Sequence, residues 1–389
     1  MTRLLFLAER FPPDIGGLAV SADRITQALC QLGLEVDVLV WSRYLQPGEV
    51  RPPDPEAQPW LPQIYRVGLY RNWDMSMPHT VNVLDWLHQT RQYDAVWGHY
   101  LFPAGFLAVW FGTLKGLPST VSVRGNDLDR GLFPPGDFAR LQWTLERASL
   151  VTSVSQDLAH KIRCLTQRQD VLVIQNAVDM DVFQAIDSPT ASHRAALGIA
   201  PDEVVLGFSG ELRQKKGQAF LLRALAMVQQ HRPACLLLIG EVRPSQDGAL
   251  QAFAAQYPEA AQRIIVTGHL TEPAAVAQHL RLCDLYLQPS LWEGMPNALL
   301  EAMACGCAVI ASDAGGIPEI IDHGQNGFLL ARSQLHHLGE AVLEFLALDA
   351  ATRDRIRQAA QARIQAEFSP EQERQRLQSV IARLIPSPS

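Results

Sequence analysis

Two glutamates flank a glycine- and proline-containing turn in a segment that could hold a sugar bound to a phosphate. Glu293 lies in this turn, and Glu301 lies in a helix that we predict over residues 297–305, closed by Gly306. Backbone N–H groups at a helix start bind anions, and carboxylates accept hydrogen bonds from sugar hydroxyls. The alternative is that Glu293 only complements the helix dipole while Glu301 is solvated. Their eight-residue spacing around the turn favours a binding site.

A second segment carries cations between two glycines. It runs from Gly210 to Gly217, follows an apolar strand predicted over 204–208, and contains Arg213 and Lys216. Fixed cations at this position could stabilise a departing diphosphate, and one such electrostatic contact is typically worth about 3 to 4 kcal/mol. The alternative is an exposed, charged turn without a ligand.

Polar residues also follow the predicted strands of the first half of the chain. His99 comes directly after a strand at 95–98, and Arg124 and Asp127 come after a strand at 119–123. Gly16 and Gly17 lie between the first strand and the first helix, where a backbone without side chains can approach a diphosphate or an acceptor. A single histidine or a glycine pair is also common in purely structural positions.

These segments require elements that place them at one edge of a sheet. Short apolar runs alternate with amphipathic helices in two successive series, which predicts an α/β protein with two Rossmann-like, doubly wound domains facing across a cleft. We place the first domain at 1–186, the second at 187–365, and a C-terminal helix that packs back on the first domain at 366–389. The predicted strands are 4–8, 35–40, 95–98, 119–123, 150–154 and 171–174 in the first series, and 204–208, 235–239, 264–267, 285–288 and 309–312 in the second.

Composition excludes several classes of protein. The chain has 389 residues, 48% of them hydrophobic, and a formal net charge of -7. A nucleic-acid binder would present a basic face, so we expect no nucleic-acid partner. The N-terminal apolar run is short and is interpreted as a buried strand, and we find no stretch of about 20 apolar residues. We expect a cytoplasmic protein, located at the inner face of the membrane if its acceptor is lipid-linked.

The segment from Glu293 to Glu301 resembles the Glu-x7-Glu motif of glycosyltransferase family 4, whose members have the GT-B fold and retain the anomeric configuration. Residues 308–319 and 326–329 continue the family pattern. The resemblance implies that Glu293 contacts the donor sugar and that Glu301 binds the ribose. It also implies that backbone groups of four residues hold the sugar and the diphosphate: Gly294, Met295, Pro296 and Asn297.

The cationic segment resembles the Gly-Arg-Leu-x-x-x-Lys-Gly pattern of the same family, with one departure. Lys216 matches the family's lysine, whereas Glu211 stands where the family has arginine. A carboxylate at this position would repel phosphate. We therefore expect Arg213 to supply the missing cation, with Glu211 either orienting it or turned away.

The resemblance extends to other loops. It implies that His99 contacts the sugar or the acceptor, that Arg124 and Asp127 belong to the binding site, and that the loop at Gly16 and Gly17 approaches the ligands. Asn176 is either a hinge residue or an acceptor contact. The loop expected to pack on the nucleobase comprises Gly268, His269 and Leu270.

The features and the resemblance together predict transfer of a sugar from a nucleoside-diphosphate sugar to a hydroxyl acceptor in polysaccharide or glycolipid assembly, and the resemblance implies retention by the following route. The diphosphate would leave with its charge held by Arg213, Lys216 and the helix start. The acceptor would attack the same face and lose its proton to the leaving phosphate. We expect no cofactor and no metal. A hydrolase or epimerase of sugar nucleotides and a non-catalytic nucleotide-sugar binder are the alternatives.

Overall fold

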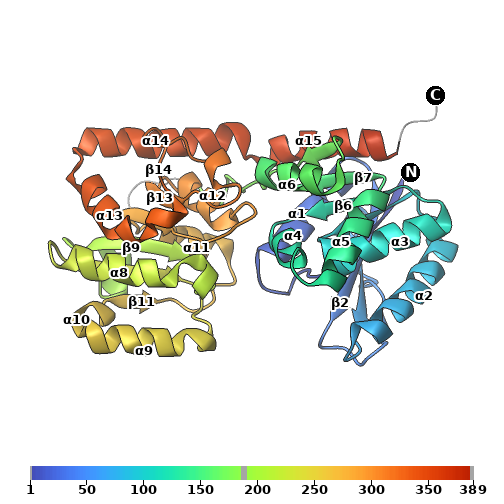
Figure 1. The fold of residues 1–389 in the computed structure, drawn as a ribbon, viewed down its shortest axis with the longest axis horizontal. Helices are drawn as coiled ribbons and strands as arrows, with labels where there is room; N and C mark the ends of the chain where they lie inside the picture. Colours follow the sequence, from blue (N-terminus) through green and yellow to red (C-terminus); the bar gives the residue numbers. More distant parts are fainter. Residues whose placement is uncertain (1, 185–190, 386–389) are drawn as a thin grey trace. The chain divides into compact units, whose positions relative to one another are not determined.

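The computed structural model describes residues 2–184 and 191–385, which form two compact units. The N-terminal unit comprises the described residues of Met1–Asn176 and Glu371–Ser389, and the C-terminal unit comprises those of Ala177–Pro370 (Figure 1). The chain thus returns to the N-terminal unit with its last helix. Our expected boundary at 186/187 lies outside the described residues, and the second change of unit falls at 370/371 where 365/366 was expected.

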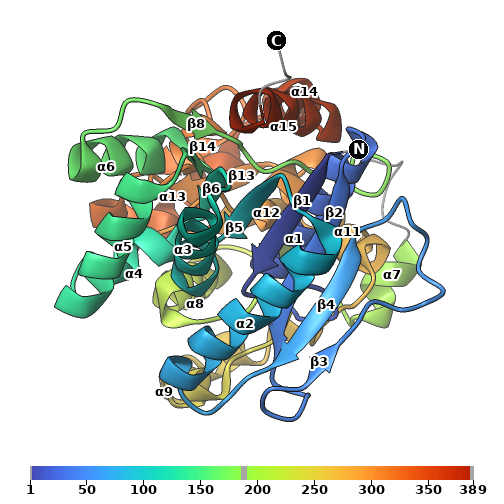
Figure 2. The same cartoon turned by 90° about the vertical axis from the view of Figure 1, so that its right-hand side faces the viewer.

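The N-terminal unit is built on an eight-stranded sheet in the order β3-β4-β2-β1-β5-β6-β7-β8. Neighbouring strands are parallel, except that β3 and β4 form an antiparallel pair at one edge (Figure 2). The strands are β1 (Arg3–Ala8), β2 (Glu35–Ser42), β3 (Val50–Arg51), β4 (Gln63–Gly68), β5 (Ala95–His99), β6 (Ser119–Val123), β7 (Leu150–Ser153) and β8 (Val171–Val173).

Alternating residues of β1 divide the core of this unit into two faces, as a strand covered on both sides requires. Leu4 and Phe6 pack with α1 and α15, whereas Leu5 and Leu7 pack with α2 and α3. The helices are α1 (Gly17–Gln31), α2 (Trp73–Arg91), α3 (Phe106–Lys115), α4 (Asn126–Gly131), α5 (Pro135–Arg147), α6 (Gln156–Thr166) and α15 (Pro370–Leu384), with a short helical turn, η1 (Leu101–Gly105).

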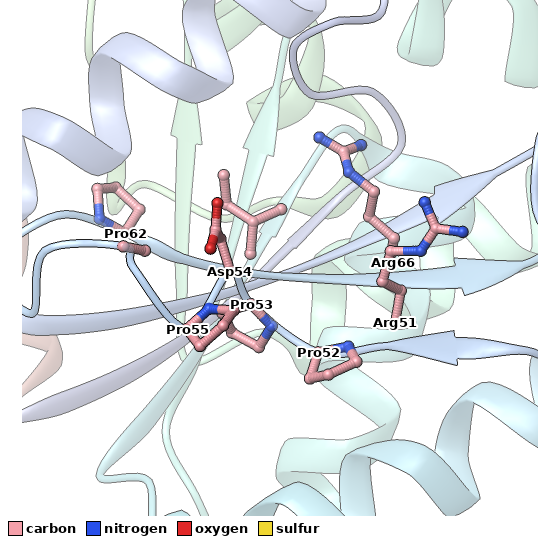
Figure 3. Close-up of a pocket in the computed structure, with 9 residues that line it drawn as sticks. Arg51, Pro52, Pro53, Asp54, Pro55, Pro62 and Arg66 are labelled. Carbon is pink, nitrogen blue, oxygen red and sulfur yellow. The ribbon is translucent and has the colours of Figure 1, made fainter.

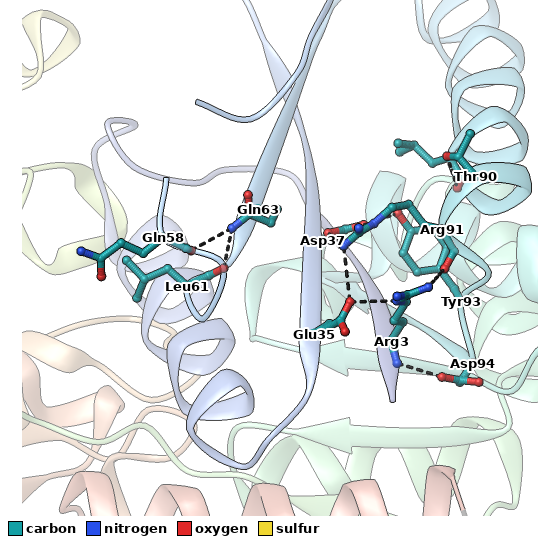
Figure 4. A network of polar contacts seen from close by, with 11 residues as sticks. Arg3, Glu35, Asp37, Gln58, Leu61, Gln63, Thr90, Arg91, Tyr93 and Asp94 are labelled. Carbon is teal, nitrogen blue, oxygen red and sulfur yellow. Dashed lines mark hydrogen bonds and ion pairs between the residues drawn. The ribbon is translucent and has the colours of Figure 1, made fainter. Parts of the chain in front are cut away.

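A buried polar network ties the end of α2 to the sheet (Figure 4). Asp37, only 1% exposed in β2, accepts hydrogen bonds from Arg91 Nε at 2.8 Å and from the Tyr93 hydroxyl at 2.7 Å. Arg3 pairs with Glu35 at 2.8 Å beside it. Because these residues lie near the amino ends of β1 and β2, they stabilise the edge opposite to the one where ligands bind in such sheets.

The C-terminal unit contains a six-stranded, fully parallel sheet in the order β11-β10-β9-β12-β13-β14. β9, β10, β12 and β13 are wholly buried, which explains their continuous apolar sequences. The strands are β9 (Val204–Ser209), β10 (Ala234–Ile239), β11 (Ile264–Val266), β12 (Leu285–Gln288), β13 (Val309–Ser312) and β14 (Phe328–Leu330).

Helices and short 3-10 turns connect these strands, and the largest core cluster joins α8 and α13 to the sheet. The helices are α7 (Ala191–Ala196), α8 (Gln218–Gln229), α9 (Asp247–Gln256), α10 (Pro258–Ala261), α11 (Pro273–Leu280), α12 (Asn297–Ala304), α13 (Leu338–Ala347) and α14 (Ala350–Glu367). The turns are η2 (Gln214–Lys216), η3 (Pro244–Gln246), η4 (Ile317–Glu319) and η5 (Arg332–His337).

Two α/β domains with parallel sheets confirm the predicted fold class. Three strands of the described residues lie outside the strands expected from the sequence: β3, β4 and β14. The two-residue edge strand β3 lies in the proline-rich segment 47–62 and pairs with β4. Among the described helices, none is both long and apolar enough to cross a membrane.

Candidate active site

A buried ion pair lies at the carboxyl edge of the C-terminal sheet. Lys216 ends η2, after β9, and its Nζ lies 2.5 Å from Oε1 of Glu293 in the loop between β12 and α12. Glu293 is 8% exposed. Burial raises the pKa of this carboxyl, but Lys216, Lys215 and the hydrogen bonds to Glu293 outweigh burial, and the net pKa is lowered. The carboxylate is therefore ionised at neutral pH.

A chain of buried side-chain hydrogen bonds leads to Glu293 from within the sheet. The Tyr286 hydroxyl donates to Gln288 Oε1 at 2.8 Å, and Gln288 Nε2 donates to Ser290 Oγ at 2.9 Å. Ser290 Oγ then donates to Glu293 Oε1 at 2.8 Å. The backbone N–H of Ser209, at the end of β9, contacts the tyrosine hydroxyl at 3.4 Å. This relay fixes the Glu293 carboxylate relative to β9 and β12.

Two glycines allow the loops around the ion pair to pack backbone against backbone. Gly217 has φ +79°, and a Cβ there would lie 1.9 Å from the carbonyl oxygen of Pro289. Gly315 has φ +54°, and a Cβ there would lie 1.9 Å from the carbonyl oxygen of Glu293. Any other residue at either position would displace the loop that holds Glu293.

The start of α12 lies directly after this loop. Pro296 caps the helix, Asn297 begins it, and Met295 is buried. The Asn297 Oδ1 atom is buried and makes no hydrogen bond with the described residues. Glu301 is the fifth helical residue and is partly exposed. The carbonyl oxygen of Gly294 accepts a hydrogen bond from the Gly316 N–H at 2.8 Å. This carbonyl therefore helps to hold the loop in place.

The carboxylate of Glu211 is neutralised by an arginine that the sequence pattern did not reveal. Arg243, from the loop after β10, donates to both carboxylate oxygens at 2.8 Å. Arg213 lies farther away, with Nη1 3.6 Å from the same carboxylate. The buried Arg213 Nε makes no hydrogen bond with the described residues. Glu211 is thus held between two arginines rather than turned away.

The expected nucleobase loop follows β11. Gly268 adopts φ +72°, its carbonyl accepts the Thr267 hydroxyl at 2.8 Å, and that hydroxyl accepts the Gly240 N–H at 3.1 Å. His269 is exposed and Leu270 is partly exposed. The loop is therefore tied to the end of β10, but no interaction between described residues links it to Glu293.

In the N-terminal unit, His99 ends β5 and is completely buried. Its Nε2 shares a hydrogen bond with the Ser21 hydroxyl at 3.0 Å, and its ring stacks on Phe6. Burial, followed by the charges of Arg124 and Arg24, lowers the histidine pKa well below its ordinary value. The ring is therefore neutral, and its buried Nδ1 makes no hydrogen bond with described residues.

Asn176 joins two arginines at the end of the N-terminal unit. Its Oδ1 accepts from Arg124 and, at 3.3 Å, from Arg24. Arg24 in turn makes a bidentate pair with Glu373 of α15, at 2.7 and 2.9 Å. Burial lowers the pKa of Arg124 to about 10. The structure thus joins Arg124 and Asn176 by a hydrogen bond and places His99 where the charge of Arg124 affects its pKa.

Asp127 holds the backbone of two loops. Its carboxylate accepts the N–H groups of Leu101, Arg124 and Gly125 at 2.7 to 3.1 Å. Burial raises its pKa to about 6, against the lowering effect of these bonds. The side chain that was expected to bind substrate is therefore engaged in positioning Arg124.

The glycine pair opens the first helix. Gly16, with φ +123°, caps α1, and both Gly16 and Gly17 are exposed. The first turn of α1 carries no acidic residue. The glycine pair thus lies next to solvent at the start of α1, and its approach to a ligand stays a prediction.

Two Asp-x-Asp sequences, which could suggest metal binding, are present. In the first, Asp127 binds backbone amides and Asp129 pairs with Lys161 at 3.1 Å. In the second, Asp179 Oδ1 accepts the N–H of Asp181 at 2.9 Å. Within residues 2–184 and 191–385, no three metal-ligating side chains gather in a group that could hold an ion.

Sequence reasoning identified both members of the central ion pair but missed the residues that support it. Gln288 and Ser290 are polar residues directly before Glu293, and this signal was available in the sequence. Arg243 is 32 residues from Glu211, and Glu373 is 349 residues from Arg24, so no local pattern could connect them.

Comparison of the folds defines the class of protein. The structure of sucrose-phosphate synthase from Thermosynechococcus elongatus covers 99% of this chain and 99% of its own, with a TM-score of 0.80 at 18% identity. Anabaena HepE, solved in complex with UDP-glucose, gives a TM-score of 0.80 at 21% identity and covers 98% of this chain and 100% of its own. The fold is GT-B.

The sequence places the chain more closely. The family described as glycosyl transferases group 1 matches residues 203–347, and the glycosyl transferase 4-like domain matches residues 16–177. The two matched domains together place the chain among the glycosyltransferases of the family 4 type, as the resemblance predicted.

Curated relatives have the same class of activity in their names. A D-inositol 3-phosphate glycosyltransferase of Jonesia denitrificans is 29% identical over 351 residues, which are 83% of this chain and 81% of the relative. An N-acetyl-alpha-D-glucosaminyl L-malate synthase of Bacillus anthracis is 26% identical over 320 residues, which are 82% of this chain and 81% of the relative.

Proposed function

We propose that this glycosyltransferase moves a sugar, with retention of its anomeric configuration, from a nucleoside-diphosphate sugar to a hydroxyl of a saccharide or glycolipid. The observation that carries the proposal is the pair between partly buried Lys216 and buried Glu293 beside the start of α12. A cation, an ordered carboxylate and helix N–H groups are the parts that a sugar diphosphate needs.

Each part has a distinct task in the proposed reaction. Lys216 has three N–H donors, and one of them is committed to Glu293, so the ammonium can also contact a diphosphate oxygen. The Glu293 carboxylate accepts hydrogen bonds from the hydroxyls of the donor sugar. Arg213, whose buried Nε has no described partner, supplies a second cation.

The bond changes follow from this arrangement. The bond between the anomeric carbon and the diphosphate oxygen breaks, and the negative charge that grows on that oxygen is stabilised by Lys216 and Arg213. The acceptor oxygen bonds to the anomeric carbon on the same face. Its proton passes to the departing phosphate, so the products are the glycoside and a nucleoside diphosphate. Glu301 binds the ribose, and backbone groups of residues 268–270 contact the base.

The relatives support a nucleotide-sugar donor. Anabaena HepE, which shares this fold, was solved in complex with UDP-glucose. We propose that the chain acts in the cytoplasm without a cofactor or a metal, since Lys216 and Arg213 supply the positive charge that stabilises the diphosphate. A lipid-linked acceptor would add contact with the inner face of the membrane.

The test is an incubation of the purified chain with UDP-, GDP- and ADP-sugars, with and without saccharide acceptors. The proposal expects acceptor-dependent release of a nucleoside diphosphate, an unchanged anomeric configuration in the product by NMR, and full activity in EDTA. Free sugar released at an acceptor-independent rate would indicate a hydrolase. An isomerised donor would indicate an epimerase, and binding without turnover would indicate a non-catalytic binder.

A further inference from the structure

An open cavity of about 560 Å³ lies within the N-terminal unit, between the β3–β4 pair and the proline-rich loop that joins them (Figure 3). Its volume falls in the range of small-molecule sites, roughly 300 to 1,000 Å³. Nothing in the site described above uses it. Its charged lining consists of Arg51, Arg66 and Asp54, and prolines make up most of the rest.

Two arginines lie side by side on one wall of this cavity (Figure 3). Arg51 and Arg66 are register partners in the antiparallel β3–β4 pair, so their side chains leave the same face of the sheet. Like charges at directly opposed positions destabilise a strand pair. Burial lowers the pKa of Arg66, the charge of Asp14 raises it, and the charge of Arg51 lowers it further. Glu49, which pairs with Arg51, and Asp14, which acts on Arg66, offset part of this repulsion, and an anion between the two guanidinium groups would reduce it further.

The described hydrogen bonds leave donors available at this position. Arg66 uses Nη2 to donate to the carbonyl oxygen of Pro12, and Arg51 donates to Glu49 at 3.2 Å. Each guanidinium carries five N–H donors, and neither makes a further hydrogen bond with the residues that the structure describes. Paired guanidinium groups with unused donors match the geometry of a carboxylate or a phosphate.

The rest of the cavity suits a sugar ring. The prolines present flat, apolar rings without N–H donors. Asp54 is the acidic group in the lining, and its Oδ1 accepts the Glu56 N–H at 2.9 Å. A carboxylate here can accept hydroxyl hydrogen bonds from a saccharide while the two arginines hold its anionic group.

Arg66 also connects the cavity to the loop that precedes α1. Its hydrogen bond to Pro12 lies in the segment that leads to Gly16 and Gly17, the expected approach to the ligands. A ligand in the cavity that binds Arg66 would therefore be connected to this loop through the Arg66–Pro12 hydrogen bond.

We propose that this cavity is an acceptor subsite for an anionic saccharide, one that carries a carboxylate or a phosphate. The inference rests on the proposed function in that an acceptor saccharide must bind the N-terminal unit. The carboxylate of a uronic acid and the phosphate of a sugar phosphate share the required chemistry.

The experiment measures the binding of three single probes to the full-length chain by calorimetry at low salt: glucose 6-phosphate, glucuronic acid and glucose. At least one anionic sugar should bind at least tenfold more tightly than glucose. The anionic sugar that binds more tightly shows whether the site prefers a phosphate or a carboxylate. The affinity should fall as salt is raised. Arg51→Ala should weaken the anionic sugar at least tenfold, because Arg51 is exposed and its removal leaves the fold intact.

Arg147→Ala is the matched control, since Arg147 is an exposed arginine of α5 and its loss changes the net charge equally. The proposal is overturned if neither anionic sugar binds more tightly than glucose, or if Arg51→Ala and Arg147→Ala bind alike. Donor binding by the wild-type chain, measured separately with nucleotide sugars, tests the proposed function. Donor binding without anionic-sugar binding would contradict the proposed subsite but not the proposed function.

Discussion

At the residue scale, the Lys216–Glu293 pair has a cost that the relay of polar side chains helps to offset. Taking both charges out of water is unfavourable, and their attraction compensates only with good geometry and further hydrogen bonds. Ser290 and Gln288 provide those bonds to Glu293. Hydrophobic residues at these positions would avoid the cost of burying charge. The chain instead keeps an ordered, charged carboxylate, as a binding site requires.

Removing the lysine should affect both stability and activity. In Lys216→Met, Glu293 is left as a buried carboxylate without its ammonium, which should lower the free energy of unfolding by roughly 3 to 5 kcal/mol. The loss of one cation should lower kcat/KM by roughly 100- to 1,000-fold. Urea denaturation and steady-state kinetics measure the two effects.

A second variant separates these effects. Adding Glu293→Gln to Lys216→Met removes the orphaned charge, so stability should recover while activity stays low. Lys115→Met is the control, because its partly exposed pair with Asp85 should contribute less than about 1 kcal/mol. Recovery of activity in the double variant would show that the pair is only structural.

Ser290 is a positioning residue whose loss should appear in the pH profile. Ser290→Ala removes a donor to Glu293 and an acceptor for Gln288, which should lower stability by roughly 1 to 3 kcal/mol. The Glu293 pKa should rise, so the acid limb of kcat should move to higher pH. Ser379→Ala, at an exposed position of α15, is the control. An unmoved acid limb would contradict the positioning role.

His99 should make the chain sensitive to acid. Its pKa is depressed in the folded state, so it contributes stability above the unfolded pKa of about 6.5 and loses that stability as pH falls below it. The slope should reach about 1.4 kcal/mol per pH unit. His99→Gln should remove this component, measured as the difference in urea stability between wild type and variant from pH 5 to 8. A pH-independent difference would contradict the assignment.

At the element scale, the C-terminal helix α15 is held to α1 by one buried carboxylate. Glu373 is 1% exposed and pairs with Arg24, and Leu377 and Val380 pack in the same core. Glu373→Ala should lower stability by roughly 2 to 4 kcal/mol, below the full range for buried pairs because Arg24 keeps a fifth of its side chain exposed.

The control for this variant lies on the same helix. Arg374→Ala breaks the exposed pair with Glu371 and an exposed hydrogen bond to Gln31 of α1, and it should change stability by less than about 1 kcal/mol. Thermal unfolding followed by circular dichroism compares the two variants. Equal effects would mean that the buried pair does not hold the helix.

The elements themselves were predictable where the pattern is local. Apolar runs gave the strands that β1, β5, β6 and β9 occupy, and the helix after Pro296 begins where the proline predicts. The strands β3, β4 and β14 were not predicted: β3 and β14 are only two and three residues long, and β4 has the sequence QIYRVG, without a continuous apolar run. The edge strand β3 forms by pairing with β4.

At the scale of the whole molecule, the sequence predicted the two-domain fold and the family, since both depend on dense local motifs. It did not predict the partners that join distant segments, such as Arg243 with Glu211. These contacts depend on which loops the sheet order brings together, and β9 and β10 are neighbours only in the folded unit. Glu211 is thus accompanied by an arginine from the neighbouring loop.

The central claim is that the Lys216–Glu293 site holds a nucleoside-diphosphate sugar, and ligand-induced stabilisation tests it most directly. A donor at about a hundred times its Kd should add about 2.7 kcal/mol to the free energy of unfolding. We predict that one of the UDP-, GDP- or ADP-sugars raises the Tm of the wild-type chain and that the shift is lost in Lys216→Met/Glu293→Gln. An equal shift in the folded double variant, or none with any donor, would contradict the account.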